Sequence, residues 1–513
     1  MRQPRRRSQA AQVSIDAPIN GIIESLPPGG KRGRDAEVLE NWLPTLRGLA
    51  VRGGTQEHAD ISSEVLTMAT YASSGSQQMF ATTASEIYEV TSSATAASAQ
   101  VTGLTSGYWS FVQIGTSGGD FLIGVNGSDS ARQFDGTSWS TVSGITGVTT
   151  SSLNYVWTHI NRLFFIEEQT LKVWYLPSGS IGGAASDLNL AGVFQRGGDL
   201  LFGGTWSLDS GDGMDDKCVF VTTQGEVAIY SGSDPSDAAT WALEGLFEIG
   251  KPLSPRGHIR VGGDLLIATD DGIIPLSSVF TKDASDLSLA AVSRPIQTTW
   301  KLEADRASDY LQLIKWTGGE TMLAILPGVD RVLSANLKTG AWAVQTGWSG
   351  NCAAELSNGV YVGTTTGVVK QIDITGADMG APFTAKVLGA FQDFGDPIRI
   401  KAASMMRGRY LADSEFDADY SVSVDFTPDF PASPAAVPNS PDVLVWGSGN
   451  WGEKVWSKAP GDATTGVLDS WVSVAGVGQE VAPGVQITSG GSTKMSVELV
   501  GIDMIVDGGG RVV

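Results

Sequence analysis

The most acidic loop of the sequence is the first place where chemistry could occur. Asp209, Asp212, Asp215 and Asp216 lie within one short stretch that also contains two glycines. Carboxylate oxygens on a flexible backbone are the ligands that Ca²⁺ prefers. The stretch lacks the spacing and the closing glutamate of an EF-hand, and acidic surface loops are common. We therefore expect a solvated loop and keep these four aspartates as the candidate metal ligands.

The histidines and cysteines give little support for catalysis. His58, His159 and His258 lie far apart in the sequence, and none has a partner at a metal-binding spacing. Cys218 and Cys352 form no paired motif, a usage that suits synthesis in a reducing compartment. The sequence also lacks a phosphate-binding P-loop. It therefore predicts no catalytic residue, no cofactor and no enzymatic activity.

A glycosidase is the enzymatic alternative, because its two carboxylates need no fixed sequence motif. Some sugar-cleaving propellers carry repeated Asp boxes of the form Ser-x-Asp-x-Gly-x-x-Trp. Asp135-Gly136-Thr137-Ser138-Trp139 approaches this pattern, but its glycine directly follows the aspartate. The 15 tryptophans could stack on sugars, although in a glycine-rich β protein we expect them mainly in the core.

A repeated glycine turn followed by a short apolar strand must position any such site. Gly197-Gly198-Asp199-Leu200-Leu201-Phe202-Gly203 has close copies at 118–124 and 262–268. Most of the spacings between its copies lie near the roughly 40 to 45 residues of a propeller blade. Several copies are followed by a second strand of alternating pattern, so the sequence predicts an all-β protein with a β-propeller of about seven blades at residues 60–376. The residues that precede the first apolar position of each copy are Gln78, Asp120, Arg162, Asp199, Asp264, Glu320 and Gly359.

The two ends of the chain depart from the repeat. Residues 1–59 form an irregular arm with one possible helix, Asp35–Trp42, which Asp35 would cap and Pro44 would end. Residues 377–513 contain strand patterns at 386–394 and 399–409 and a predicted hairpin of 481–487 with 494–506. We expect the N-terminal arm and this C-terminal module to form an additional β platform domain.

The charge of the chain argues against nucleic-acid binding. The formal net charge is −21, and only the first 60 residues carry a small positive excess. Such an acidic body repels phosphate and anionic lipid. No stretch approaches the roughly 20 apolar residues of a membrane span, and the basic start lacks the apolar core of a secretion signal. We expect a chain made in the cytoplasm, without membrane insertion.

Several motifs in a particular order resemble a known family. The N-terminal ones are Ala17-Pro18-Ile19-Asn20-Gly21, a stretch at 36–44 and Val51-Arg52-Gly53-Gly54. They continue at 88–91, 107–109, 122–127 and 134–137, and the C-terminal ones are Trp446 to Trp456 and a stretch at 501–510. In this order the motifs resemble the tail nozzle proteins of short-tailed phages, also called packaged-DNA stabilisation proteins and akin to tail tubular protein B.

The resemblance implies a structural subunit of the virion tail, made in the host cytoplasm and assembled as a homohexamer. It would dock on the tail adaptor ring below the portal, contact tail fibres, retain the packaged double-stranded DNA and form the conduit for its ejection. DNA would pass without specific binding, along a lumen lined by many of the carboxylates. The alternative is a propeller surface protein that binds or cleaves glycans, as a receptor-binding protein or a depolymerase. We expect the adaptor contact to lie in the arm from Pro18 to Gly54 together with the C-terminal module. The residues expected to make it are Pro18, Asn20, Gly21, Asn41, Trp42, Pro44, Arg52 and Gly54.

Overall fold

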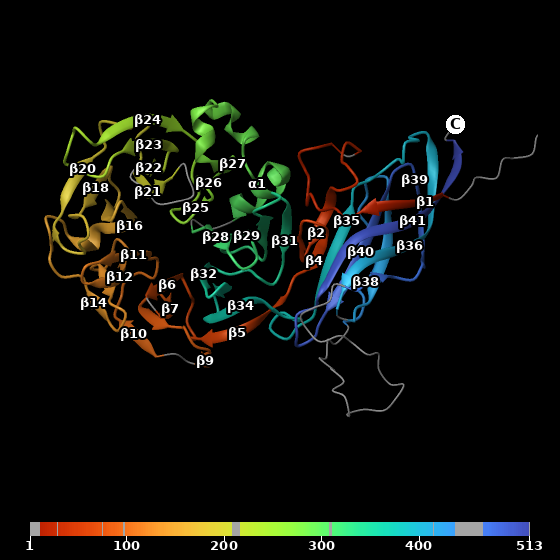
Figure 1. Ribbon diagram of the computed structural model, residues 1–513, viewed down its shortest axis with the longest axis horizontal. Helices are drawn as coiled ribbons and strands as arrows, with labels where there is room; N and C mark the ends of the chain where they lie inside the picture. Colours follow the sequence, from red (N-terminus) through yellow and green to blue (C-terminus); the bar gives the residue numbers. More distant parts are fainter. Residues whose placement is uncertain are drawn as a thin grey trace, which may run out of the picture. The chain divides into compact units, whose positions relative to one another are not determined.

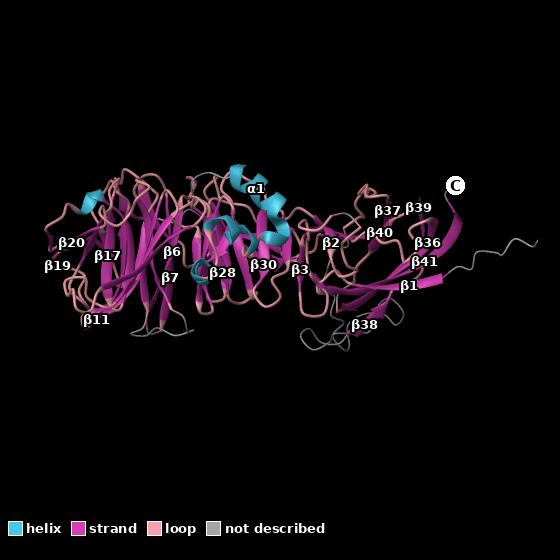
Figure 2. Ribbon diagram, turned by 90° about the horizontal axis from the view of Figure 1, so that it is seen from above, coloured by secondary structure: helices cyan, strands magenta, loops and turns pink. Residues whose placement is uncertain are grey.

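The computed structural model describes residues 11–27, 29–73, 75–95, 98–207, 216–306, 310–413, 415–436 and 465–511. Within these residues the chain is all-β, with one α-helix, α1 (Gln297–Arg306), and a few short 3₁₀ turns (Figure 2). The 3₁₀ turns are Thr150–Ser152, Leu276–Phe280, Ala284–Leu289 and Arg294–Ile296. None of the helical segments in this described part has the length and apolarity that crossing a membrane requires. The chain divides into two compact units.

One unit, which comprises Glu57–Asp330 and Ser349–Gln371, is a β-propeller. Six sheets of three to five strands follow one another around a centre (Figure 1). Besides these sheets, the short strands β15 (Ile145–Thr146) and β19 (Gly183–Ala184) of this unit pair with each other. The six sheets contain, in turn, β6 (Thr67–Ser73), β7 (Ser76–Thr82), β8 (Glu86–Glu89) and β10 (Ala99–Thr102); β11 (Ser110–Thr116), β12 (Gly119–Val125), β13 (Arg132–Phe134) and β14 (Trp139–Thr141); β16 (Leu153–His159), β17 (Arg162–Glu167), β18 (Lys172–Tyr175) and β20 (Ser186–Asn189); β21 (Leu200–Trp206), β22 (Lys217–Thr222), β23 (Glu226–Ser231) and β24 (Ala242–Glu248); β25 (His258–Val261), β26 (Asp264–Thr269) and β27 (Gly272–Pro275); and β32 (Cys352–Leu356), β33 (Gly359–Gly363), β34 (Val368–Thr375), β5 (Gly54–Asp60) and β9 (Ala94–Thr95).

The sequence predicts about seven blades, whereas the propeller has six such sheets. The difference arises at the copy that begins at Glu320, which forms a hairpin of β28 (Gln312–Trp316) and β29 (Thr321–Ile325) within this unit. The hairpin is fixed on both sides. The backbone N–H of Leu313 donates to the carbonyl of Arg256, just before β25, at 3.1 Å. The Gln312 amide exchanges hydrogen bonds of 3.0 and 2.9 Å with the backbone of Ala353 in β32.

Apolar clusters between neighbouring sheets hold the propeller together. Trp157 and Phe164 of one sheet pack with Phe220 of the next, and the Trp157 and Phe220 rings meet edge to face at 5.8 Å. A similar cluster joins β21–β23 to β26, with Phe202 and Trp206 in it. Burying a large apolar side chain contributes about 1.5–3 kcal/mol, so each interface is a substantial stabilising layer. The expectation that tryptophans serve mainly in the core is confirmed at these positions.

The repeated copies occupy equivalent places in the sheets with one exception. The copies that start after Gln78, Asp120, Arg162, Asp264, Glu320 and Gly359 supply the second strand of their sheet or hairpin, whereas the copy after Asp199 supplies the first strand, β21. The equivalent second strand of that sheet is β22. This shift explains why the separation between the copies at Arg162 and Asp199 is short and the separation between those at Asp199 and Asp264 is long.

The other unit comprises Met1–Gln56, Arg331–Trp348 and Ile372–Val513. Its strands form two groups. In one, strands β3 (Trp42–Pro44), β4 (Leu49–Val51), β41 (Val497–Arg511), β36 (Arg399–Ala412) and β38 (Thr465–Leu468) lie in that order, with β1 (Ala11–Asp16) on β41 and β39 (Val472–Gly478) on β36. In the other, the order is β30 (Val332–Asn336), β31 (Trp342–Gln345), β2 (Ala36–Glu40), β35 (Phe383–Gly389), β40 (Val481–Ser489) and β37 (Ala418–Val424).

Three expectations for this unit are corrected. Residues 36–40 form strand β2 rather than part of a helix over Asp35–Trp42, because their backbone pairs with β35. Tertiary pairing of this kind overrides a weak helix signal. Strands β40 and β41 form no hairpin: β40 pairs with β35 and β37, whereas β41 pairs with β36. Residues 331–348, which the sequence places in the propeller, belong to this unit, where Val344 pairs with Glu40 of β2.

Candidate functional site

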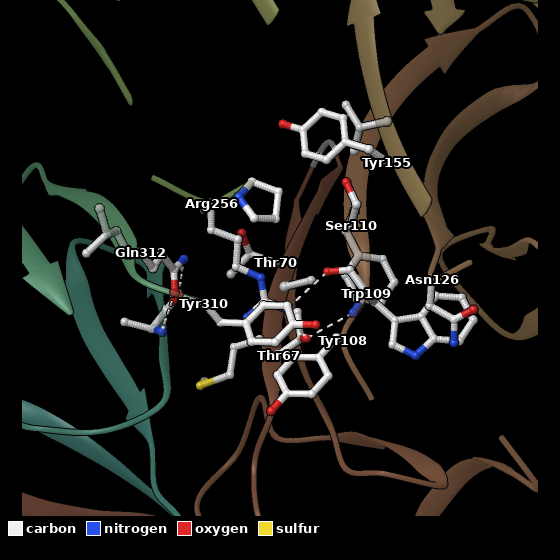
Figure 3. Close-up of a pocket in the computed structure, with 18 of the residues that line it drawn as sticks. Thr67, Thr70, Tyr108, Trp109, Ser110, Asn126, Tyr155, Arg256, Tyr310 and Gln312 are labelled. Atoms are coloured by element: carbon white, nitrogen blue, oxygen red, sulfur yellow. Dashed lines mark hydrogen bonds between the residues drawn. The ribbon is translucent and has the colours of Figure 1, made fainter. Parts of the chain in front are cut away.

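A cavity of about 730 Å³ lies at the centre of the propeller unit. Its walls include the first strands of five of the six sheets, β6, β11, β16, β25 and β32, together with β28 of the hairpin (Figure 3). First strands line the centre because each sheet presents its innermost edge there. A volume of this size is typical of small-molecule pockets. Since all its lining residues belong to the propeller unit, the cavity is the candidate functional site.

Three side chains at equivalent positions converge in this cavity. Tyr108, Arg256 and Tyr310 each lie two residues before a first strand, namely β11, β25 and β28. The rings of Tyr108 and Tyr310 stack with centroids 3.7 Å apart and an interplanar angle of 8°. The Arg256 guanidinium carbon lies 5.9 Å from the Tyr108 centroid and 5.5 Å from the Tyr310 centroid. At such distances the ring quadrupoles attract the cation.

The guanidinium of Arg256 is held by neutral acceptors. Its Nη1 donates to the carbonyl of Leu66 at 2.9 Å, and its Nη2 donates to the hydroxyl of Thr67 and to the carbonyl of Trp109 at 3.3 Å. The residues that the structure describes offer it no carboxylate partner. Burial accordingly lowers the pKa of Arg256 below its usual value, although an arginine stays charged at neutral pH. Arg256 thus places a fixed positive charge in the cavity that forms no ion pair with a described residue.

A neutral histidine lines another part of the wall. The Nε2 of His258 is 3.2 Å from the hydroxyl of Tyr155, and its ring stacks on Phe202 at a centroid distance of 4.2 Å. Burial lowers the pKa of His258 to about 4, although a hydrogen bond to Pro255 opposes that shift. His258 is therefore uncharged at pH 7 and adds no charge to the cavity. Burial also raises the pKa of Tyr155, so its hydroxyl stays protonated.

Three further charged side chains line the cavity. The exposed ammonium of Lys315 forms no hydrogen bond or ion pair within the described ranges, and the carboxylate of Glu168 likewise accepts no hydrogen bond there. Glu355 differs, because its carboxylate accepts from the backbone N–H of Thr317 at 2.8 Å and from the Thr317 hydroxyl at 3.0 Å. The groups that remain available to a ligand are therefore Arg256, Lys315 and Glu168.

The candidate metal ligands lie partly outside the described residues, which exclude Asp209, Asp212 and Asp215. Asp216 is buried, and its carboxylate accepts a hydrogen bond from the hydroxyl of Ser207. Within the described ranges no group of three or more His, Cys, Asp or Glu side chains is placed to hold a metal ion.

The other chemistry-bearing residues are separated as well. His58 bonds the carbonyl of Val90 at 2.9 Å, and His159 bonds Thr205 at 3.1 Å and the carbonyl of Gly232 at 3.0 Å. Neither is among the residues that line the cavity with His258. The cysteines, Cys218 and Cys352, are both buried with free thiols.

The residues expected to contact a partner lie in the non-propeller unit, and most are internal. Of the eight, Asn20 is exposed, whereas the others are buried: Pro18, Gly21, Asn41, Trp42, Pro44, Arg52 and Gly54. Arg52 donates to both carboxylate oxygens of Asp378, at 2.8 and 2.6 Å. Asn41 accepts from Nε of Arg52 at 2.9 Å. Arg52 and Asn41 therefore form hydrogen bonds within the interior of their own unit. The Trp446, Trp451 and Trp456 motif lies outside the described residues.

Sequence reasoning missed Tyr108, Arg256 and Tyr310. Their side chains are of different types and come from segments far apart in the sequence, so no motif joins them. The signal is positional. Had the copies been aligned on the first strand of each sheet instead of the second, the three would have occupied the same column, two residues before that strand.

The comparisons with known proteins add little. No family model matches the sequence, and no curated protein matches it. Among solved structures, the computationally designed Ika8 protein is 7% identical with a TM-score of 0.37 and covers 62% of this chain and 100% of its own. BBS1N in complex with ARL6DN is 9% identical, with a TM-score of 0.39 and coverage of 64% and 98%. YCF48 bound to D1 peptide is 11% identical, with a TM-score of 0.36 and coverage of 64% and 98%. Because all three TM-scores are low, none of these likenesses supports a conclusion about function.

Proposed function

We propose that the chain is a structural nozzle subunit of a short-tailed phage tail. In this role it closes the vertex below the portal and adaptor, retains packaged DNA and forms the conduit for ejection, as a homohexamer. The observation that carries the proposal is the ordered set of motifs at 17–21, 36–44, 51–54, 88–91 and 501–510. We further propose that the non-propeller unit is the platform through which subunits dock on the adaptor.

The way the chain is divided supports this proposal. Met1–Gln56 and Ile372–Val513, the two ends of the sequence, cluster into one unit, while the propeller is built from the residues between them. Strand β1 pairs with β41 over six residues, from Ala11 with Val506 to Asp16 with Gly501. Motifs from both ends of the chain thus meet in one unit, as a shared docking platform would need.

The conduit in this proposal runs between subunits rather than through a propeller. The central cavity has the size of a small-molecule pocket, and stacked tyrosines occupy it. A net charge of −21 per chain would keep phosphate from adhering to the wall of such a conduit. We also propose that the β28–β29 hairpin acts as a seventh blade, a role that its bonds to Arg256 and Ala353 support.

Electron microscopy of the protein mixed with tail-less phage particles tests the nozzle role. We expect six-fold rings at the portal vertex of the particles. Asn20→Ala, at the exposed member of the expected contact set, should lower the fraction of particles that carry a ring. Arg196→Gln, which removes an exposed cation from the propeller, serves as the control and should leave that fraction unchanged. Particles that stay bare with the unmodified protein would rule out the nozzle role.

The second candidate is a propeller surface protein that binds or cleaves glycans. The observation in its favour is the partly exposed ring of Tyr108 in a cavity with free charged groups. Incubation with capsular polysaccharide, followed by size-exclusion chromatography, separates the two candidates. Shortening of the polysaccharide by a monomeric protein would favour this candidate over the nozzle.

A further inference from the structure

The central cavity is asymmetric in the groups that it leaves unpaired. On one side the Arg256 guanidinium makes three hydrogen bonds through its terminal nitrogens, which leaves Nε without an acceptor in the described chain. An arginine has five N–H donors, so part of its capacity remains for a ligand. Lys315 adds a second free cation to the lining. An anionic oxygen is the natural complement of these groups, because charge-assisted hydrogen bonds are about twice as strong as neutral ones.

Acceptors that lack a donor lie elsewhere in the same lining. The side-chain carbonyl oxygen of Asn154 is buried and has no hydrogen-bond partner among the described residues. Leaving a buried polar atom unpaired costs about 1–3 kcal/mol, so a donor from a bound molecule would stabilise it. The carboxylate of Glu168 is a second free acceptor. Both groups complement hydroxyl donors.

An aromatic face completes the set. Tyr108 is 36% exposed although it stacks on Tyr310 through one face. Part of the residue therefore remains accessible to a ligand, and flat apolar surfaces of this kind pack against the C–H face of a sugar ring. Burial, with Tyr310 as the next cause, raises the pKa of Tyr108, so its hydroxyl remains a neutral donor at pH 7.

We propose that the central cavity of the propeller unit binds a small hydroxylated organic anion of the sugar-acid class. Its carboxylate contacts Arg256 and Lys315, its hydroxyls donate to Asn154 and Glu168, and its ring lies on Tyr108. The cavity of about 730 Å³ accommodates one or two sugar rings, since ligand pockets hold drug-sized molecules in roughly 300–1,000 Å³. This binding does not depend on assembly into a tail.

Isothermal titration calorimetry of the full-length protein tests the proposal with four probes. D-glucuronate carries both the carboxylate and the hydroxyls, glucose only the hydroxyls, acetate only the carboxylate, and inorganic phosphate a different oxyanion. We expect glucuronate to bind at least about ten-fold more tightly than each of the other three, since one charge-assisted hydrogen bond is worth about a factor of ten or more.

Variants connect the binding to the named residues. Arg256→Gln should weaken glucuronate binding about ten-fold or more, and Lys315→Gln and Tyr108→Ala several-fold each. Lys315 and Tyr108 are exposed, so their variants test the site even if Arg256→Gln does not fold. Arg196→Gln, which removes an exposed cation that pairs with Glu248 and does not line the cavity, should bind as the unmodified protein does.

Three results would overturn the proposal. The first is that glucuronate does not bind, or binds no better than glucose. The second is that phosphate or acetate binds as tightly as glucuronate, which would leave a simple oxyanion site. The third is that Lys315→Gln and Tyr108→Ala both bind glucuronate with the affinity of the Arg196→Gln control.

Discussion

At the scale of the single residue, Arg52 has every hydrogen-bonding nitrogen occupied. Its nitrogens donate to Asn41, to Asp378 and to the carbonyls of Gly53 and Thr346. The side chain is fully buried, and that of Asp378 is 17% exposed. Removing one member of a buried ion pair leaves the other charge uncompensated, which is more costly than the pair itself is stabilising.

We predict that Arg52→Ala lowers the free energy of unfolding of its unit by about 3 kcal/mol. The matched control is Arg34→Ala, whose ion pair with Asp16 is more than half exposed on both sides. Exposed pairs contribute about 0–1 kcal/mol, so the control should have little effect. Urea denaturation followed by circular dichroism measures both variants. Equal effects of the two substitutions would contradict the internal role of Arg52.

The carboxylate of Asp503 couples strand β1 to pH. Burial would raise its pKa, but hydrogen bonds from Ser14 and Arg407 and the charges of Arg409 and Arg407 outweigh that effect, so the pKa is lowered. The bond from Ser14 in β1 is 2.7 Å long. A lowered folded-state pKa stabilises the fold above the unfolded value of about 3.9, and this contribution is lost as the pH falls below it.

We predict that the pairing of β1 with β41 weakens as the pH falls below about 4. Asp503→Asn removes the titrating group, so the variant should show weaker pairing at pH 7 and little further loss in acid. Amide hydrogen exchange of β1, corrected for the intrinsic pH dependence of exchange, measures the effect. Unchanged protection of β1 from pH 6 to pH 3 in the unmodified protein would refute it.

At the scale of the element, the strands of the propeller could be predicted from the sequence, whereas the strand pairing in the other unit could not. Alternation and glycine turns mark each strand locally, and neighbouring strands in a propeller sheet are mostly neighbours in sequence. In the other unit β1 pairs with β41 at the opposite end of the chain, and β2 lies between β31 and β35. A local sequence pattern contains no information on such distant partners. The predictions of a hairpin over 481–506 and of a helix over Asp35–Trp42 were wrong for this reason.

The turn at Gly21 fixes where the arm enters its unit. Gly21 has φ +75°, and a Cβ there would lie 2.5 Å from both the backbone N and the backbone O of Trp342. Gly103 has nearly the same conformation, φ +77°, with open space around its Cβ position. Comparing alanine substitutions at these two positions therefore separates the cost of the left-handed backbone conformation from the cost of a steric clash.

We predict that Gly103→Ala costs about 1–2 kcal/mol, the usual penalty of a left-handed conformation for a residue with a Cβ. Gly21→Ala should cost at least about 1 kcal/mol more, since the methyl group must displace the backbone of Trp342. Thermal unfolding monitored by calorimetry gives the two values. Gly21→Ala no more destabilising than Gly103→Ala would show that β31 can move away without cost.

At the scale of the whole molecule, the net charge could be predicted from the sequence, whereas the candidate site could not. The charge could be read directly from the sequence, because it is a sum over residues. The cavity could not, because the ring of sheets brings Tyr108, Arg256 and Tyr310 together, and a sum or a local pattern says nothing about which residues face a shared centre. The acidic charge therefore supports the strongest prediction about the intact chain.

We predict that the full-length protein does not bind duplex DNA, even at low salt. With a net charge of −21, counterion release offers no gain in affinity, and repulsion strengthens as the Debye length grows to about 30 Å at 0.01 M salt. Fluorescence anisotropy of a labelled 30-base-pair duplex at 10 and 150 mM NaCl measures this. A variant with Arg2, Arg5, Arg6 and Arg7 changed to Gln tests whether the basic start contributes any residual binding. Binding that weakens steeply with salt in both proteins would reveal a basic surface on the folded chain, and such a surface would make a conduit that retains DNA rather than releases it.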